Sequence, residues 1–252
     1  MSNSSISLVL IARNEAHDLP NCLASVEDLV NETILLDNNS TDDTIKIAKQ
    51  FGAKTETRKF DGFASQKNHA INMASNEWIL HLDPDESLTP ALKEEIRQIV
   101  QNTKYSAFNI PYQNLFLGKK MRFGSFLGEK HIRLFKKSVS KFGGGLIHEG
   151  IEVNGEIGEL KNKIIHNSYP NLEEYFKKFN EYTTLSAQKA HQEGKKFTIF
   201  KLLAFPLNFL KLYILKLGCL DGIHGIIWAT ISSCYGFVKY SKLYVIEKEN
   251  KK

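Results

Sequence analysis

The chain is organised around residues 77–86, which read Glu-Trp-Ile-Leu-His-Leu-Asp-Pro-Asp-Glu. An apolar pattern of strand length leads directly into Asp83-Pro84-Asp85. Pro84 cannot continue a hydrogen-bonded ladder, so we expect the strand to end there. Residues i and i+2 of an extended chain lie on one side, which lets both carboxylates face one point. The pair therefore predicts a site for a hard divalent cation, unless it is simply a solvated acidic turn.

Strand and helix patterns alternate on both sides of this run. Residues 6–11 and 33–36 are apolar runs of the kind that is buried on both faces of a sheet. Apolar residues at helical spacing follow each of them, and Ser40 or Thr41 is expected to cap the second helix. This alternation predicts an α/β fold with a mainly parallel sheet flanked by helices.

Three polar clusters follow predicted strands, at residues 13–15, 37–39 and 83–85. In parallel sheets, ligands bind at the carboxyl ends of the strands, so these clusters are expected to share one edge. Neither a Gly-x-Gly-x-x-Gly motif nor a phosphate-binding P-loop occurs at these turns, which argues against dinucleotide and P-loop sites.

The alternation stops near residue 105, where short strand patterns and three consecutive glycines appear. We therefore expect a domain at 1–169, with a mainly parallel half at 1–104 and a mixed half at 105–169 that adds a lid or acceptor platform to the sheet. His148 and Glu149 follow the glycines, where the backbone can approach a ligand closely. Residues 170–252 are predicted to form a separate helical region.

Charge is unevenly distributed along the chain. The net charge is +5, and residues 168–252 hold 13 Lys and no Arg against seven acidic residues. The basic tail predicts an acidic partner, either nucleic acid or an anionic membrane surface. Residues 197–220 are apolar but interrupted by lysines and Pro206, so they do not have the pattern of a spanning helix. They fit either an amphipathic segment in the membrane interface or a helix pair packed on the first domain.

Three linked motifs resemble those of family 2 glycosyltransferases of the GT-A fold. They are residues 8–15 (LVLIARNE), 35–42 (LLDNNSTD) and 82–86 (LDPDE), in the order and spacing of that family. Further segments are similar to the bacterial branch of β-1,4-glucosyltransferases that modify the lipopolysaccharide inner core. These segments are residues 133–135 (RLF), 147–149 (IHE), 165–169 (IHNSY), 220–222 (LDG) and 239–243 (KYSKL).

The resemblance makes residues 1–104 the nucleotide-sugar half, or donor half, and residues 105–169 the acceptor half. It also implies roles for residues at the predicted edge. Asp37 would bind the uracil ring, and Asp83 and Asp85 would hold Mg²⁺ or Mn²⁺ on the diphosphate. Lys67 would reach a phosphate as a point charge, unless it is an exposed helix lysine. The remaining candidates, for the uridine and ribose, are Ala12, Arg13 and Glu15.

The resemblance also implies inversion at the sugar carbon, which requires one base beside the acceptor. Glu149 is the expected base, and His148 is the rival because its pKa is nearer neutral. His166 is either a further metal ligand or a hydrogen-bonded histidine at a strand end.

The activity implied is transfer of glucose from UDP-glucose to an inner-core heptose of a lipid A-core acceptor. The enzyme would be peripheral on the cytoplasmic face of the inner membrane, in keeping with a first segment that lacks a secretory signal. The alternatives are another UDP-sugar with a polyprenyl-phosphate or capsule acceptor, and a nucleotide- or nucleic-acid-binding protein with a basic tail. No nucleic acid is expected as a partner, because no helix-turn-helix spacing, RNA-binding motif or zinc pattern is present.

Overall fold

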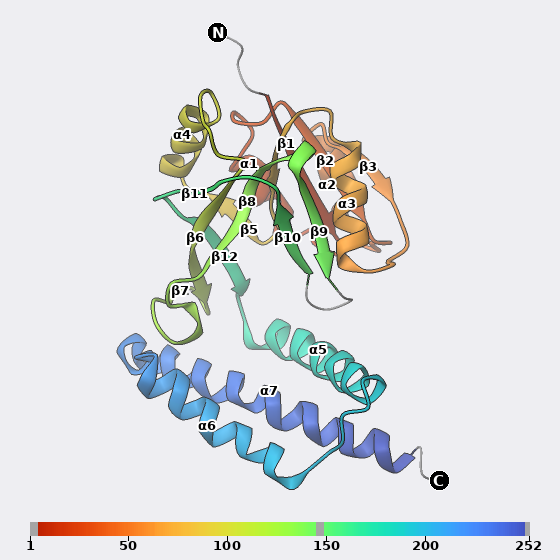
Figure 1. Cartoon of the computed structure of the whole chain (residues 1–252), viewed down its shortest axis with the longest axis vertical. Coiled ribbons are helices and arrows are strands. Elements are labelled where there is room, and N and C mark those ends of the chain that lie inside the picture. The colour runs from red at the N-terminus through yellow and green to blue at the C-terminus, as the bar shows by residue number, and fades with distance from the viewer. Residues whose placement is uncertain (1–4, 145–148, 250–252) are drawn as a thin grey trace. The chain divides into compact units, whose positions relative to one another are not determined.

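The computed structural model describes residues 5–144 and 149–249; at Glu149 it describes the backbone alone. The chain forms two units (Figure 1). The first comprises Met1–Gln113 and Lys130–His166, and the second comprises Asn114–Glu129 and Asn167–Lys252. Most of the second unit follows residue 166, and it also includes residues 114–129, which the predicted domains assigned to the first domain.

The described residues contain one large sheet with the strand order β3-β2-β1-β4-β8-β6-β12-β5, and β7 and β11 both pair with β6. The strands β1 to β4 are parallel, whereas β8 is antiparallel to both of its neighbours. The prediction of an α/β fold with a parallel first half and a mixed second half is therefore confirmed. The strands are β1 (Ile6–Ala12), β2 (Glu32–Asp37), β3 (Lys54–Thr57), β4 (Trp78–His81), β5 (Glu86–Leu88), β6 (Ala107–Phe116), β7 (Lys119–Lys120), β8 (Lys130–Lys136), β11 (Ile157–Glu159) and β12 (Ile164–Tyr169).

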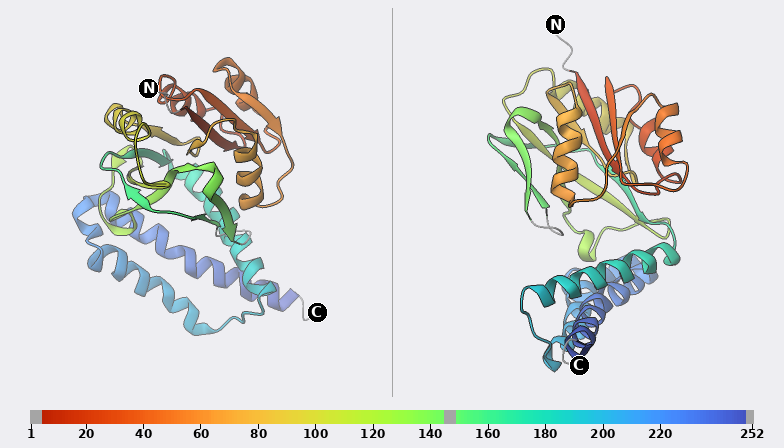
Figure 2. Two further views of the ribbon diagram at one scale, coloured as in Figure 1. Left: turned by 45° about the horizontal axis from the view of Figure 1, so that its top comes forward. Right: turned by 90° about the vertical axis from the view of Figure 1, so that its right-hand side faces the viewer.

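Side chains alternate between the two faces of β1, and both faces are covered. Leu8 and Leu10 belong to a core with helices α1 (Leu19–Ala24), α2 (Thr44–Gln50) and α4 (Pro90–Ile99). Val9 belongs to a second core with α3 (Phe63–Met73) and the hairpin β9–β10 (Ser140–Gly144 and Glu149–Val153). Figure 2 shows these two layers on opposite sides of the sheet. Burial on both faces explains why the strand sequence is continuously apolar.

The second unit consists largely of helices. Helix α7 (Gly222–Glu249) packs against both α5 (Leu172–Gln192) and α6 (Ala204–Leu210) (Figure 1). Two short segments extend α6, a 3₁₀ turn at Ile199–Leu203 and a π-helical turn at Lys211–Leu215. No single described helix is long and apolar enough to cross a bilayer. Taken together, the helical segments Ile199–Leu215 and Gly218–Glu249 are long and apolar enough to cross a bilayer, by length and composition alone, and they meet at an angle of 71°.

Asp221 ties residues 114–129 to the helices of this unit. Its buried carboxylate accepts hydrogen bonds from the backbone N–H groups of Arg122 (3.1 Å) and Phe123 (3.0 Å). Its backbone oxygen accepts one from Lys119 Nζ at 2.6 Å. The indole N–H of Trp228 donates a hydrogen bond to Ser125 Oγ at 2.7 Å. These bonds explain why the segment groups with residues that follow it by about a hundred positions in the sequence.

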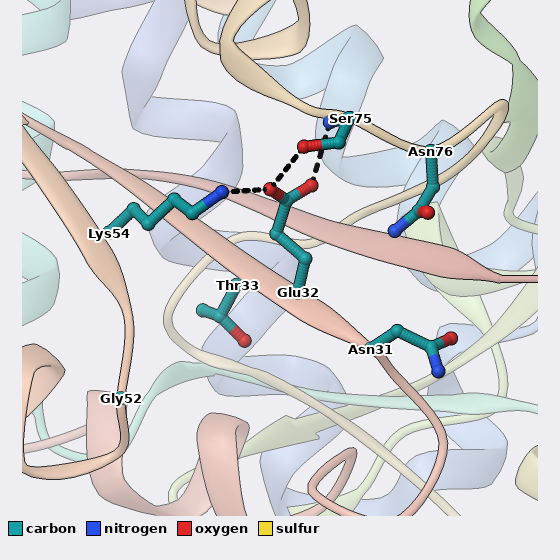
Figure 3. A pocket seen from close by; sticks show the side chains of 7 residues that line it. All are labelled: Asn31, Glu32, Thr33, Gly52, Lys54, Ser75 and Asn76. Atoms are coloured by element: carbon teal, nitrogen blue, oxygen red, sulfur yellow. Dashed lines mark hydrogen bonds and ion pairs between the residues drawn. The ribbon is translucent and has the colours of Figure 1, made fainter.

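Glu32 anchors the amino end of β2, at the edge of the sheet opposite Asp37. Its carboxylate accepts hydrogen bonds from Lys54 Nζ (2.5 Å), Ser7 Oγ (2.6 Å) and both the N–H (2.8 Å) and Oγ (2.8 Å) of Ser75. Figure 3 shows Lys54 and Ser75 converging on it. Burial acts to raise the pKa of Glu32, but these donors outweigh it and lower the pKa to about 2.

We expect Glu32→Gln to lower the free energy of unfolding by about 1–2 kcal/mol at pH 7, because it removes the charged acceptor. The unfolded pKa of a glutamate is about 4.3. The difference between wild type and variant should therefore persist above about pH 5 and vanish as pH falls towards the folded pKa of about 2. Urea titrations across this range measure it. Asp43→Asn is the control, since Asp43 is largely exposed in its pair with Lys46; an equal effect there would contradict the assignment.

Candidate functional site

The loops that follow β1 and β2 are joined by hydrogen bonds at the carboxyl edge of the sheet. Asn14 N–H donates to Ser40 Oγ at 2.9 Å, and Thr41 N–H donates to Asn14 Oδ1 at 2.8 Å. Asn14 and Asn39 both have left-handed backbones, with φ of 57° and 52°. Asparagine tolerates that conformation better than most residues, so both loops can turn sharply.

The start of α2 continues this network and corrects one expectation. Helix α2 begins at Thr44, so the prediction that Ser40 or Thr41 caps it is wrong. Asp42 accepts instead from Thr44 N–H at 3.1 Å and from Ala16 N–H at 3.1 Å. Ser40 and Thr41 are used to hold the neighbouring loop, a role that local sequence spacing does not reveal.

Asp37 ends β2 and is completely buried. Its Oδ2 accepts a hydrogen bond from Ser40 N–H at 3.0 Å. Its Oδ1 is also buried and has no hydrogen-bond partner among the described residues. A buried carboxylate oxygen without a donor is costly, so a ligand N–H at this position would be stabilising.

The other predicted nucleotide contacts lie at the same edge. Ala12 is the register partner of Asp37, and its backbone oxygen accepts from Asn38 N–H at 2.8 Å. Arg13 is exposed, and Glu15 is half-buried with its N–H donating to Thr44 Oγ1 at 2.8 Å. The backbone of this loop is therefore fixed, while the Arg13 side chain is accessible to solvent.

The carboxylate run forms a tight turn between β4 and β5. Strand β4 ends at His81, as expected for a strand followed by proline. Glu86 N–H donates to the backbone oxygen of Asp83 at 2.9 Å, and Asp83 N–H donates to Glu86 Oε2 at 3.0 Å. Glu86 therefore closes the turn with both its backbone and its buried side chain.

Arg133, on β8, holds this turn from the adjacent strand. Its Nη2 donates to Asp83 Oδ2 and to Glu86 Oε1, both at 2.5 Å. Its Nε donates to the Tyr112 hydroxyl at 2.5 Å, and its Nη1 donates to His81 Nδ1 at 3.0 Å. Tyr112 in turn donates to Glu86 Oε1 at 2.8 Å. Local sequence patterns predicted no role for Glu86, His81 or Tyr112, and Arg133 was recognised only as part of the RLF motif.

The charges of this cluster depend on burial and on Arg133. Burial acts to raise the pKa of Asp83, but the positive charges of Arg133 and Lys67 outweigh it and hold that pKa well below its usual range. Burial raises the pKa of Glu86, and Arg133 only partly opposes this. Burial also lowers the pKa of His81, so a neutral ring accepts the bond from Arg133. Asp83 is thus a fixed anion, and 40% of its side chain is exposed to solvent.

Asp85 faces a different partner, His166, which lies on β12. Strand β5 pairs with β12 so that His166 is opposite Glu86, and this register brings His166 Nε2 within 3.5 Å of Asp85 Oδ2. Two ligands of one octahedral ion lie about 3 Å apart, so this pair fits a shared divalent cation. Two of the three predicted metal ligands, Asp85 and His166, thus lie together, whereas Asp83 is bound by Arg133. The 3.5 Å contact fits both expectations for His166, a metal ligand and a hydrogen-bonded histidine at a strand end, so the metal site stays a prediction.

No group of three or more His, Cys, Asp or Glu side chains that could hold a metal converges within the described ranges 5–144 and 149–249. A Mg²⁺ or Mn²⁺ ion held by Asp85 and His166 would therefore take further oxygens from a bound phosphate or from water. Such sharing between one or two protein ligands and substrate phosphates is usual for Mg²⁺.

Helix α3 presents Lys67 and Asn68 towards the hairpin β9–β10. Lys67 is buried rather than an exposed helix lysine, and its Nζ lies 5.0 Å from the centre of the Phe142 ring. Asn68 exchanges two hydrogen bonds with the backbone of Phe142, at 2.8 and 2.9 Å. The hairpin is thereby fixed next to α3, close to the start of β10 at Glu149. The Glu149 side chain and all of His148 lie outside the described residues.

We expect Arg133→Ala to lower the free energy of unfolding by about 3–5 kcal/mol, because Glu86 would be left buried without its cation. Lys104→Ala is the matched control. Lys104 pairs with Glu156 in a largely exposed contact, so its loss should cost about 0–1 kcal/mol. Adding Glu86→Gln to Arg133→Ala should cost less than the sum of the two single changes, as measured by urea unfolding. Strict additivity would show that the two side chains are not coupled.

The sequence is similar to that of a known enzyme family over much of its length. Residues 7–148, more than half of the chain, match the model of the glycosyl transferase family 2. An uncharacterized glycosyltransferase of Rickettsia typhi is 31% identical over 94% of this chain and 86% of its own length. A lipopolysaccharide core biosynthesis glycosyltransferase of Rhizobium meliloti, LpsC, is 25% identical over 95% of this chain and 92% of its own length.

Solved structures give weaker similarities. S. aureus TarS (residues 1–349), crystallised with UDP-GlcNAc, aligns over 98% of this chain and 91% of that chain at 12% identity and a TM-score of 0.49. Glucosyl-3-phosphoglycerate synthase from Mycobacterium tuberculosis, crystallised with Mn²⁺, UDP and glucosyl-3-phosphoglycerate, aligns over 44% of each chain at 21% identity and a TM-score of 0.37. The family match and the full-length relative are sufficient without them: the chain is a glycosyltransferase that belongs to glycosyl transferase family 2.

Proposed function

We propose that this enzyme transfers a hexose, with glucose favoured, from a UDP-sugar to an inner-core heptose of lipopolysaccharide, with inversion at the sugar carbon. The observation that carries the donor half is the buried Oδ1 of Asp37 at the end of β2, which has no hydrogen-bond partner within residues 5–144 and 149–249. It lies at the carboxyl edge of the sheet, which is also the edge where β4 leads into Asp83 and Asp85. Ligands of open α/β sheets bind at this edge.

The Asp37 carboxylate is suited to uracil. Uracil carries an N–H at ring position 3, which would donate to the unpartnered Oδ1. The other oxygen is already held by Ser40 N–H, so the carboxylate is oriented before the base binds. Cytosine has a hydrogen-bond acceptor at the same ring position, which would face the carboxylate oxygen, also an acceptor. This contact therefore favours UDP over CDP.

The diphosphate would lie near Asp83, Asp85 and Lys67. Asp85 and His166 would hold a Mg²⁺ or Mn²⁺ ion, which would supply Lewis-acid stabilisation of the charge that develops on the leaving UDP. The exposed part of Asp83 remains available to accept hydrogen bonds from the donor, while Arg133 fixes its position. Lys67 would add a positive charge from α3.

Inversion requires a group that takes the proton of the acceptor hydroxyl. We assign this role to Glu149, the first residue of β10 in the hairpin that Asn68 anchors, with His148 as the alternative. A fall in kcat for Glu149→Gln with unchanged UDP affinity would support this assignment, and a normal kcat would favour His148.

The acceptor assignment is argued from two similarities. It comes from the motif resemblance to inner-core glucosyltransferases and from the similarity to LpsC, which is described as acting in lipopolysaccharide core biosynthesis. An acceptor carried by lipid A implies a peripheral location at the cytoplasmic face of the inner membrane. A polyprenyl-phosphate or capsule acceptor would leave the donor chemistry unchanged.

Asp37→Asn should weaken binding of UDP and reduce the preference for UDP over CDP by about tenfold or more, because an amide can place a donor where the carboxylate places an acceptor. Calorimetric titrations with both nucleotides measure the ratio. Asp43→Asn, a largely exposed position beside the same loop, should leave the ratio unchanged. An unaltered ratio in Asp37→Asn would remove Asp37 from the base site.

Asp85→Ala should abolish the effect of Mn²⁺ on UDP affinity. We expect Mn²⁺ to strengthen UDP binding by about tenfold or more in the wild type, because the ion would bridge Asp85 and the diphosphate. His166→Ala should reduce this effect in the same direction. Calorimetry with Mn²⁺ and with a chelator measures it without reference to turnover. Equal Mn²⁺ enhancement in the wild type and in Asp85→Ala would contradict the metal assignment.

A further inference from the structure

An apolar stripe runs along the exposed side of α6 and its two short extensions. It consists of Phe200, Leu203, Leu207, Leu210 and Ile214, whose spacing alternates between three and four residues. Side chains at this spacing lie on one face of a helix. Each of the five is more than half exposed, from 51% for Ile214 to 76% for Phe200. Isolated exposed apolar residues are ordinary, but a continuous stripe of this kind marks an interaction surface.

The opposite side of the same segment is used for packing inside the helical unit. Ala204 packs against Gly236 of α7 so closely that a Cβ added to Gly236 would lie 3.4 Å from the Cβ of Ala204. Leu212, further along the same segment, is buried. The turn into α7 is also closely packed, since a Cβ on Gly225 would lie 1.9 Å from the backbone oxygen of Gly218. The segment is therefore held by one face while the stripe is presented on another.

The segment that carries the stripe is basic, with Lys195 paired to Glu193 at 2.7 Å and Lys201 Nζ lying 5.0 Å from the ring centre of Tyr240 on α7. Residues 195–220 contain five lysines (Lys195, Lys196, Lys201, Lys211 and Lys216) and no aspartate or glutamate. Lysine side chains can lay their methylene stems along an apolar surface and extend their charges to its rim. An apolar stripe with a cationic rim is complementary to a lipid surface that carries negative head groups.

We propose that this stripe is a membrane-docking face, which places its apolar side chains at the acyl boundary of an anionic bilayer and its lysines among the head groups. The proposal deepens the proposed function, on which it rests for the lipid-linked acceptor. Vesicle binding tests the docking face and UDP titration tests the donor site, so the failure of one proposal can be told from the failure of the other.

Charge favours a membrane over a second copy of the chain. A two-fold dimer formed by this face would bring residues 195–220 of each protomer together, and that segment has no acidic residue to pair with the lysines of its partner. An anionic bilayer instead strengthens binding by about fivefold for each basic residue near its surface.

Flotation of the full-length protein with vesicles of phosphatidylcholine, with and without phosphatidylglycerol, tests the proposal. We expect binding to the anionic vesicles, weakened as salt is raised and as the phosphatidylglycerol is left out. Leu207→Glu should weaken it by about tenfold or more, and Phe200→Glu should repeat the effect at the other end of the stripe. Leu185→Glu, at an exposed leucine of α5, is the matched control and should bind like the wild type.

UDP titration of each variant shows that the fold and the donor site are intact, since none of these residues belongs to that site. Equal losses in Leu207→Glu and Leu185→Glu would contradict a localised docking face. Binding that is indifferent to phosphatidylglycerol would contradict the role of the lysines. A vesicle-free dimer in sedimentation experiments that Leu207→Glu dissociates would overturn the proposal and assign the stripe to a second copy.

Discussion

The contact of the Arg133 guanidinium with Asp83 and Glu86 is the constraint on which the site geometry depends. Two carboxylates within one four-residue turn would repel each other if both were buried without a cation. Arg133 reaches them from a neighbouring antiparallel strand and also binds Tyr112 and His81. The turn is thus fixed by side chains from three strands of the sheet, and Asp83 has its position set before any ligand binds. Such preorganisation lowers the cost of orienting charged groups during a reaction.

The same edge is fixed a second time by the loops after β1 and β2. Asn14 and Ser40 hold one loop to the other, and both loops leave strands that are hydrogen-bonded neighbours. Asp37 therefore keeps one oxygen bound to the backbone and one without a protein partner in the described part of the chain. The proposed base contact at Asp37 and the proposed diphosphate site at Asp83 and Asp85 thus follow the parallel strands β2 and β4, which both pair with β1.

Periodicity predicted the donor half well, because strands buried on both faces have continuous apolar sequences and the polar clusters at their ends share an edge. It did not predict Arg133 as a partner of Asp83, since antiparallel β8 is distant in the sequence and nothing local indicates its register. The grouping of His166 with Asp85 likewise depends on the pairing of β5 with β12. Lys67 was left open between a phosphate ligand and an exposed lysine, and its burial became evident only when α3 was placed against the hairpin β9–β10.

The measurement that tests the account most directly is release of UDP from a panel of UDP-sugars, with Mn²⁺, Mg²⁺ or a chelator, by the full-length protein. The account predicts slow, metal-dependent release of UDP from UDP-glucose, faster when a lipopolysaccharide core acceptor is added. Release from a different UDP-sugar would retain the site and change the sugar assigned to it. Absence of both UDP release and calorimetric UDP binding would contradict the assignment of the carboxyl edge as a nucleotide-sugar site.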